Sequence, residues 1–552
     1  MPRRSPAALR RVRARIACPV LGGALALGAT SAPAAHAQPS QAHVITLQAP
    51  GSPRLSLTLD GRDWSALPGV ALPLPQVELP AWDTAAGARI RAGAEILILL
   101  GVDAGYYWLG KTADTSKWEL SWSWDSWRKK LITMEAVSLD ANEFETNMAW
   151  HPFGGTLYYL VARGNGLGMG ESLLYSASGS ALWEYVAEYP EKISLNDLVL
   201  TPVTGLALGE PLHALGVLFE RGERTVAHRL LAAALSPFRA AHRAVDRRPA
   251  ARAPRLDERG LPDEGWRRIE LSAGAGAVAR NGGRLAPEER IGASAELIQI
   301  PEYGRPGRAG RAAWGGSFCK AAVEVAMRGR EAIGIDVSSK TALGGYYWQD
   351  IARREGGELS GYSLYAGAAT AFSYSWRDFS AQEVDKIAGA HVVGPSLDLT
   401  LHHRGLRVRA GIDAYADLAA VRAAALGEYL VRGKREGIKT VLADRGYYFA
   451  LGVTVAPSIS VRYGGIEIAG EVRYDALESI EGLDRVQRIV TNDFHLQDRR
   501  LGYRARLAVA PAGGRVEISL FEIEGLERSG SIGAHRRVHR EIQARTRASL
   551  LF

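Results

Sequence analysis

The sequence predicts an α+β fold in which a helical segment rich in small residues precedes an antiparallel transmembrane β-barrel of about 10–12 strands. Three observations predict this fold. Polar and apolar residues alternate from about residue 266 onward, the last alternating segment ends on the aromatic residue Phe552, and residues 86–245 carry apolar, glycine-rich stretches without that alternation. The expected units are a signal peptide (1–37), a periplasmic lead-in (38–85), a helical domain (86–245), a linker (246–265) and an outer-membrane β-barrel (266–552).

The first 37 residues have the features of a cleaved secretory signal. Six arginines within residues 3–15 precede a short apolar run at 16–29, and Ala35-His36-Ala37 fits the A-x-A cleavage pattern. We therefore expect export across the inner membrane of a Gram-negative-like bacterium, with Gln38 as the first residue of the mature chain.

Removal of this signal changes the charge balance. The whole chain carries a net charge of +8, but without the six arginines 61 basic residues face 59 acidic ones. A nearly neutral mature chain gives no reason to expect nucleic-acid binding. Cys319 would be its one cysteine, which excludes an internal disulfide and a cysteine-based metal site.

Residues 38–131 contain three local patterns. Leu55, Leu57 and Leu59 alternate as in a strand, and the apolar residues 85–109 fit either a helix or a pair of strands. Four tryptophans follow, and they fit membrane-interface anchoring or core packing better than a ligand cage; they are Trp118, Trp122, Trp124 and Trp127.

Residues 141–220 carry the most specific pattern in the chain. The segment reads N-x-x-x-H-P-x-x-G at 147–155, A-R-x-N-G at 162–166, S-x-x-W-E-x-x-x-E at 180–188 and S-x-N-D at 194–197, followed by a Gly-Glu pair at 209–210. In this order the motifs resemble the bacterial domain-of-unknown-function family numbered 3943. The resemblance implies a bacterial envelope protein and supplies no catalytic residues.

Five ionisable residues in this segment are candidates for chemistry: His151, Glu184, Glu188, Asp197 and Glu210. They are candidates either for a carboxylate-rich metal site or for a general acid and base with separated pKa values.

Each candidate also has a structural reading. Asp197 follows Ser194 at capping-box spacing, His151 precedes Pro152 and can hold a turn, and Glu210 precedes Pro211 near an expected helix end. Glu184 and Glu188 share one helix face and can pair with Arg163. The alternative to a catalytic site is thus a structural polar network that includes Asn147, Arg163, Asn165, Ser194 and Asn196.

Glycines in the same segment predict tight helix packing. The spacing Gly205-x-x-x-Gly209 allows two helix backbones to approach closely. Since no stretch offers about 20 uninterrupted apolar residues, the helices are expected to pack on one another, against the barrel end or inside its lumen.

The barrel half contains long alternating segments. Between Tyr362 and Trp376 the even positions form one apolar face with aromatic residues at both ends, which is typical of a lipid-facing strand. A soluble β-sandwich also alternates, but these segments have the length of tilted membrane strands, about 9–11 residues or more.

The final strand completes the prediction. Apolar or small residues at even positions from Ile542 to Phe552 alternate with Gln543, Arg545 and Arg547. This ending resembles the C-terminal signature of bacterial outer-membrane barrels. That resemblance implies an outer-membrane location, contact with outer-membrane lipids and recognition by the barrel-assembly machinery.

Three functions remain open at this stage. The chain is an outer-membrane barrel that the helices plug or gate, an envelope enzyme that modifies or hydrolyses a lipid-like substrate through the His/carboxylate set, or a scaffold without chemistry. The sequence has no phosphate-binding glycine loop, H-E-x-x-H or G-x-S-x-G motif. No organic cofactor is expected, and the sequence leaves open whether a metal binds.

Overall fold

The structure is a computed structural model that describes residues 43–47, 55–59, 84–109, 118–247, 253, 255–380, 383–427, 429, 440–481, 495–510 and 514–552. The expected signal peptide lies outside these residues. The chain divides into two compact units, 1–84 and 85–552. In the first, β1 (His43–Leu47) pairs antiparallel with β2 (Leu55–Leu59), which contains the alternating leucines.

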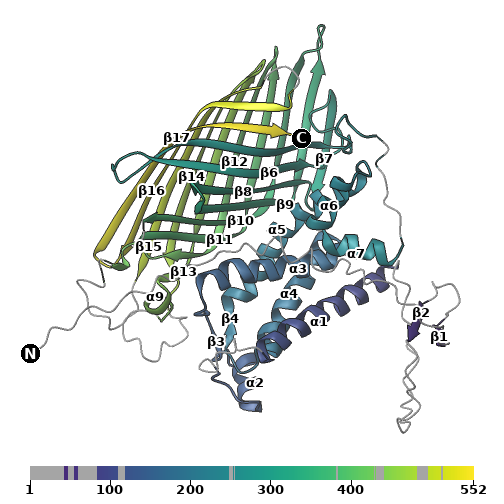
Figure 1. Ribbon diagram of the computed structural model, residues 1–552, viewed down its shortest axis with the longest axis vertical. Helices are drawn as coiled ribbons and strands as arrows, with labels where there is room; N and C mark the ends of the chain where they lie inside the picture. Colours follow the sequence, from purple (N-terminus) through teal and green to yellow (C-terminus); the bar gives the residue numbers. More distant parts are fainter. Residues whose placement is uncertain are drawn as a thin grey trace, which may run out of the picture. The chain divides into compact units, whose positions relative to one another are not determined.

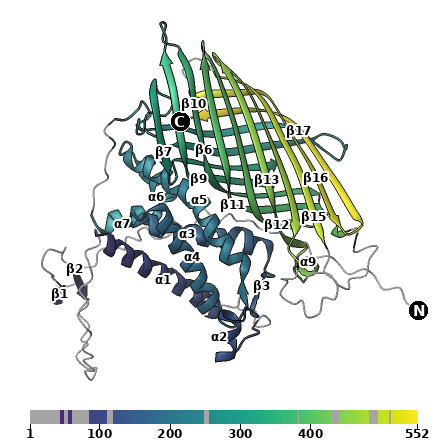
Figure 2. The same ribbon diagram turned by 180° about the vertical axis from the view of Figure 1, so that it is seen from behind.

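In the second unit, twelve antiparallel strands close into a barrel (Figures 1 and 2). Consecutive strands pair, β9 pairs with β10, and the first strand β5 pairs with the last strand β17. This confirms the predicted fold class. The strands are β5 (Trp266–Arg280), β6 (Ala286–Ile298), β8 (Phe318–Arg328), β9 (Glu331–Arg353), β10 (Leu359–Ser380), β11 (Glu383–His403), β12 (Leu406–Arg422), β13 (Tyr447–Tyr463), β14 (Ile466–Ser479), β15 (Leu496–Val509), β16 (Val516–Ile532) and β17 (His535–Leu551).

A short additional strand, β7 (Gly307–Trp314), pairs with the second half of β9. Because β8 pairs with the first half of β9, β7 and β8 lie one after the other along β9. The residues between them include Gly315 and Gly316, both in the left-handed region with φ of 50° and 74°.

The last strand shows which side of the wall faces outward. On β17 Ile542 and Leu550 are 49% and 51% exposed, whereas Gln543 and Arg545 are 4% and 5% exposed. The apolar positions therefore face away from the lumen and the polar positions face into it, as in a membrane barrel and unlike a soluble sandwich.

Ion pairs fill much of the lumen. Arg290 bonds to Glu324 and Gln543, at 2.5 and 3.0 Å, and Arg377 bonds to Glu541 at 2.6 Å. Towards the end of the barrel where β10 leads into β11, a second group joins Asp385 and Asp498 to Arg500 and Arg528 across β11, β15 and β16. A cavity of about 600 Å³ remains near the opposite end, where the chain enters at Trp266.

The helical part of this unit comprises α1 (Ala85–Leu109), α2 (Trp124–Leu131), α3 (His151–Gly164), α4 (Met169–Leu182), α5 (Leu195–Arg221), α6 (Val226–Leu235) and α7 (Pro237–Val245). A π-helical turn, η2 (Thr146–Trp150), precedes α3, and another, η3 (Trp183–Ala187), follows α4. Residues 85–109 thus form a helix rather than a strand pair. A further helix, α9 (Thr440–Arg445), lies between β12 and β13.

Helix α5 is the core of the helical part. It packs on α3 and α4, and Pro202 and Pro211 both lie inside it, so Glu210 is not near a helix end. Within the described residues, α5 is the helix that combines the length and the apolar composition of a membrane span, although most of it is buried in the fold.

Helix α5 lies on the outward side of the barrel wall rather than in the lumen. Ala214 and Leu215 pack against Leu297 and Cys319, which alternate with lumenal residues such as Glu296. Near the other end of the helix, Leu200 belongs to a cluster with Leu418 and Phe449. The sequence left open packing of the helices on one another, against the barrel end or inside the lumen. The helices do pack on one another, and α5 contacts the outer side of the wall rather than the lumen.

This packing changes the interpretation of strand β10. Tyr362 is 46% exposed on the outward side, as expected for a lipid-facing residue, but Phe372 is 4% exposed. Tyr374, further along the same face, contacts the ring of Phe144 in the helical part. The alternation is as predicted, yet only part of this face is free to contact lipid because the helical part covers the rest.

Candidate functional site: a histidine and carboxylate cluster

Three segments that are distant in sequence bring Asp140, His151 and Asp197 together. Asp140 follows the short strand β3 (Val137–Ser138), which pairs in parallel with β4 (Ile193–Ser194). His151 is the first residue of α3, directly after the π-helical turn, and Asp197 lies in the first turn of α5. π-Helical turns occur mostly as single turns and often near functional sites.

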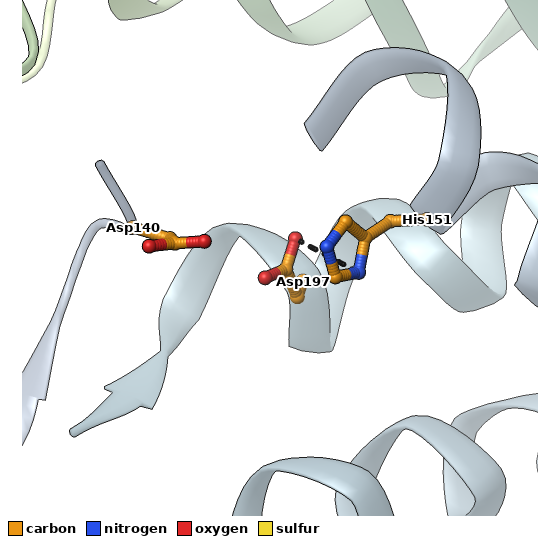
Figure 3. A group of neighbouring side chains, drawn as sticks. All are labelled: Asp140, His151 and Asp197. Atoms are coloured by element: carbon orange, nitrogen blue, oxygen red, sulfur yellow. Dashed lines mark ion pairs between the residues drawn. The ribbon is translucent and has the colours of Figure 1, made fainter. Parts of the chain in front are cut away.

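The three side chains point toward one another (Figure 3). Each offers one ligand atom, and these atoms all lie within 4.8 Å of one another. Nδ1 of His151 is 3.6 Å from Oδ1 of Asp197. Asp140 and Asp197 are buried, while the His151 side chain keeps 18% of its surface exposed, so the imidazole is the accessible side of the cluster.

Hydrogen bonds hold the two carboxylates in place. The backbone N–H of Asp140 donates to Oδ1 of Asn196 at 2.7 Å, and the Asn196 amide donates to Oδ1 of Asp197 at 2.8 Å. Ser194 is the N-cap of α5, because its hydroxyl accepts from the backbone N–H of Asp197 at 3.3 Å. The predicted cap is present, and it positions Asp197 as well as the helix.

Asn147 connects this region to the barrel. Its amide donates to the Tyr447 hydroxyl at 2.9 Å, and that hydroxyl donates to the backbone oxygen of Asn142 at 2.7 Å. The Asn142 amide in turn donates to Asp140. Oδ1 of Asn147 is buried and accepts no hydrogen bond from the described protein atoms, so an acceptor close to the loop that carries Asp140 is left unsatisfied.

Glu184 and Glu188 form the acidic surroundings of the cluster. Glu184 is 1% exposed and accepts from the backbone N–H of Ser194 at 2.7 Å. Burial, together with the negative charges of Glu191, Asp140 and Asp197, raises the pKa of Glu188 to about 8. Two of the five predicted residues thus surround the cluster formed by His151 and Asp197.

Glu210 belongs to a different group. Its carboxylate accepts from Arg163 at 2.8 and 2.9 Å and from the Tyr159 hydroxyl at 2.6 Å. It lies roughly 20 Å along α5 from Asp197 at 1.5 Å per residue. Arg163 therefore pairs with Glu210 and not with Glu184 or Glu188, and Glu210 stabilises the contact between α3 and α5. The remaining network residue, Asn165, donates to Glu95 of α1 at 2.8 Å.

Asp140 is the cluster member that the sequence did not single out. It stands just before the recognisable motifs, and its only local sign is a short polar run with Asn142. Nothing in the spacing indicates that β3 and β4 pair and so bring this residue to the start of α5.

The donor set fits a divalent metal ion. Two carboxylates and one imidazole are ligands of Mn²⁺, Fe²⁺ and Zn²⁺, and a site with three protein ligands leaves positions for water or substrate. A cation would also offset the repulsion between Asp140 and Asp197. Among the described residues, no lysine or arginine lies within ion-pair distance of Asp197.

The closed strand pairing, the apolar outer face and the polar lumen define an outer-membrane type of β-barrel that carries a helical domain on its wall. Residues 136–238 match the family described as "Domain of unknown function (DUF3943)". This confirms the resemblance noted from the motifs, and the matched segment contains all three residues of the cluster.

No curated protein matches the chain. Among solved structures, the translocator domain of autotransporter NalP from Neisseria meningitidis is 12% identical, over 54% of this chain and 91% of its own, with a TM-score of 0.17. The NanC porin is 8% identical, over 51% and 98%, with a TM-score of 0.21. OprD of Pseudomonas aeruginosa is 10% identical, over 52% and 95%, with a TM-score of 0.18. These scores are low, and the barrel assignment rests on the strand pairing.

Proposed function

We propose that this chain is an outer-membrane barrel whose helical domain binds one divalent metal ion at Asp140, His151 and Asp197 and uses it for hydrolysis of an ester or phosphoester. The observation that carries the proposal is the convergence of three ligand atoms within 4.8 Å, from three separate segments. The unsatisfied Asn147 oxygen beside the Asp140 loop supports it.

The chemistry follows from the donor set. A metal ion held by three protein ligands lowers the pKa of a bound water and so supplies a nucleophile near neutral pH. His151, the partly exposed ligand, marks the side from which a substrate would approach. Glu184 is buried and Glu188 is half-buried close by, and a carboxyl with a raised pKa is suited to give a proton to a leaving group.

The proposal includes the cellular location. Export by the signal at 1–37 and insertion by the assembly machinery through the strand that ends at Phe552 would place the domain in the outer membrane.

Metal content of the purified full chain tests the site. The protein is stripped with a chelator, incubated with Mn²⁺ or Zn²⁺, desalted and analysed for bound metal. We expect about one ion per chain for the single site. Asp197→Asn and His151→Gln should lose it, whereas Glu171→Gln, which removes an exposed partner of Arg89, should retain it.

Two results would overturn the proposal: a wild-type chain that retains no metal, or site variants that retain as much as Glu171→Gln. Far-ultraviolet circular dichroism establishes that each variant keeps its helices. Release of product from a water-dispersed phosphoester, compared with and without metal, then tests the hydrolytic step separately from binding.

A further inference from the structure

We infer that the helical domain is embedded in the lipid bilayer beside the barrel, so that acyl chains cover the outer face formed by α1 and α4. The inference concerns where the domain lies and does not depend on the metal site. It starts from the position of α5 on the outward side of the wall.

Helix α5 extends over most of the height of that wall. Its second half contacts Leu297 and Cys319, near the end where the chain enters the barrel. Its first half belongs to the cluster with Leu418 and Phe449, near the opposite ends of their strands. The hydrocarbon layer must contact the wall between these two ends, so α5 crosses the level of that layer.

The parts of the wall that the helices leave uncovered indicate that this level faces lipid. On β13 and β14 the outward residues Ile459 and Ile468 are 53% and 60% exposed, and on β5 Leu271 is 48% exposed. The helical domain replaces lipid over β8, β9 and β10. Its own far side must then contact the same medium as these neighbouring strands.

Four helical segments have the length that this position requires. They are α1 (Ala85–Leu109), the continuous run 146–164 of η2 and α3, the continuous run 169–187 of α4 and η3, and α5. Each is close to or longer than the roughly 20 residues that cross a hydrocarbon core.

The face that these helices leave uncovered is apolar. On α1, Leu97, Ile98 and Val102 are 59–65% exposed, and on α4, Leu174 is 67% exposed. Ser178 lies on the same side of α4, and its hydroxyl donates to the backbone oxygen of Leu174 at 2.8 Å, so it needs no water. A soluble domain rarely exposes so many large apolar residues on adjacent helices.

The two ends of this face carry residues that favour membrane interfaces. At one end, Arg89 of α1 pairs with Glu171 of α4. At the other end, Trp108 donates to the backbone oxygen of Ala187, and Trp122 and Trp124 are each more than 70% exposed. Charged residues at one boundary and tryptophans at the other fit a segment anchored in a bilayer. Asp103 lies one turn before Tyr106, close to the aromatic end.

Spin labels at single cysteines test the inference in the full chain reconstituted into phosphatidylcholine vesicles. Leu97→Cys and Leu174→Cys report on the helical face. Ile468→Cys on the barrel serves as the lipid-facing reference, and Arg536→Cys near the turn between β16 and β17 serves as the water-facing reference. The buried Cys319 remains in every variant, and the wild-type chain reports its background labelling.

The measured quantity is the ratio of relaxation by oxygen, which concentrates in lipid, to relaxation by a water-soluble nickel complex. We expect this ratio to be several-fold higher for the labels at 97 and 174 than for the label at 536. The ratio should match that at 468. Nickel access equal to that at 536 would show a face in water and would overturn the inference. Exclusion of both reagents together with spin–spin broadening would show a second copy on this face, and it would overturn the inference equally. Heat-dependent mobility in gels confirms folding of each variant.

Discussion

A close contact between the backbones of α3 and α5 depends on single glycines. A β-carbon on Gly155 would lie 1.9 Å from the backbone oxygen of Thr201, and one on Gly205 would lie 2.5 Å from the backbone oxygen of Gly155. The neighbouring Gly154 has open space at the same point. The contact between α3 and α5 therefore needs glycine at 155 but not at 154.

This difference predicts opposite results for two adjacent substitutions. Gly155→Ala should destabilise the helical domain by about 1–3 kcal/mol, because α3 and α5 must move apart. Gly154→Ala should be neutral or slightly stabilising, since alanine favours the helix. Thermal unfolding in detergent, followed at 222 nm, measures both, and equal losses would contradict the assigned contact.

Glu188 predicts the sign of a pH effect. The folded domain raises its pKa from an ordinary 4.5 to about 8. The protonated carboxyl is therefore favoured by folding, and its contribution is complete below about pH 4.5 and is lost as the pH rises through 8. In the presence of chelator, the helical domain should unfold at a lower temperature at pH 9 than at pH 6.

Glu188→Gln should reduce that pH dependence, because the amide does not ionise. Glu171→Gln is the matched control, since it also replaces a carboxylate of the helical domain, one that is exposed and paired with Arg89. A slope in Glu188→Gln as large as that in Glu171→Gln would assign the effect to other groups.

At the scale of secondary-structure elements, ion pairs tie non-adjacent strands together across the lumen. Asp385 of β11 accepts from Arg500 of β15 at 3.0 Å through both oxygens and also pairs with Arg528 of β16. All three side chains are at most 5% exposed. Losing one partner would leave buried charges without compensation.

Asp385→Asn should therefore cost about 3–5 kcal/mol and lower the temperature at which the folded band disappears in gels. Glu527→Gln removes an exposed partner of Arg540 and should change that temperature little, because surface pairs contribute at most about 1 kcal/mol. If the two variants behave alike, the lumenal group does not stabilise the barrel.

Secondary-structure elements could be predicted from the sequence better than the tertiary contacts between them. Strands such as β17 were predictable because a two-residue period reports directly on which side a residue faces. The cap at Ser194 was predictable because it is local. The pairing of Arg163 with Glu210, and the arrival of Asp140 beside Asp197, depend on how β3, β4 and the helices pack, and short-range spacing carries no information about that.

For the whole molecule, the contents of the lumen determine whether solutes pass. The helices lie outside the wall, but buried ion pairs between non-adjacent strands occupy the interior. We expect the purified chain to give no steady single-channel current in planar bilayers at neutral pH. Stable, ohmic steps from folded protein would show that these side chains leave an open path.

The junction of β5 and β17, which closes the barrel, has a consequence for the order of folding. The strands that close it, β5 and β17, keep exposed outward residues such as Leu271 and Ile542, whereas α5 lies mainly over β8, β9 and β10. Because the helices lie away from this junction, β5 and β17 can pair after α5 has docked on the wall, without any movement of the helical domain. A barrel that closes last at this junction would already carry its helical domain on the opposite part of the wall.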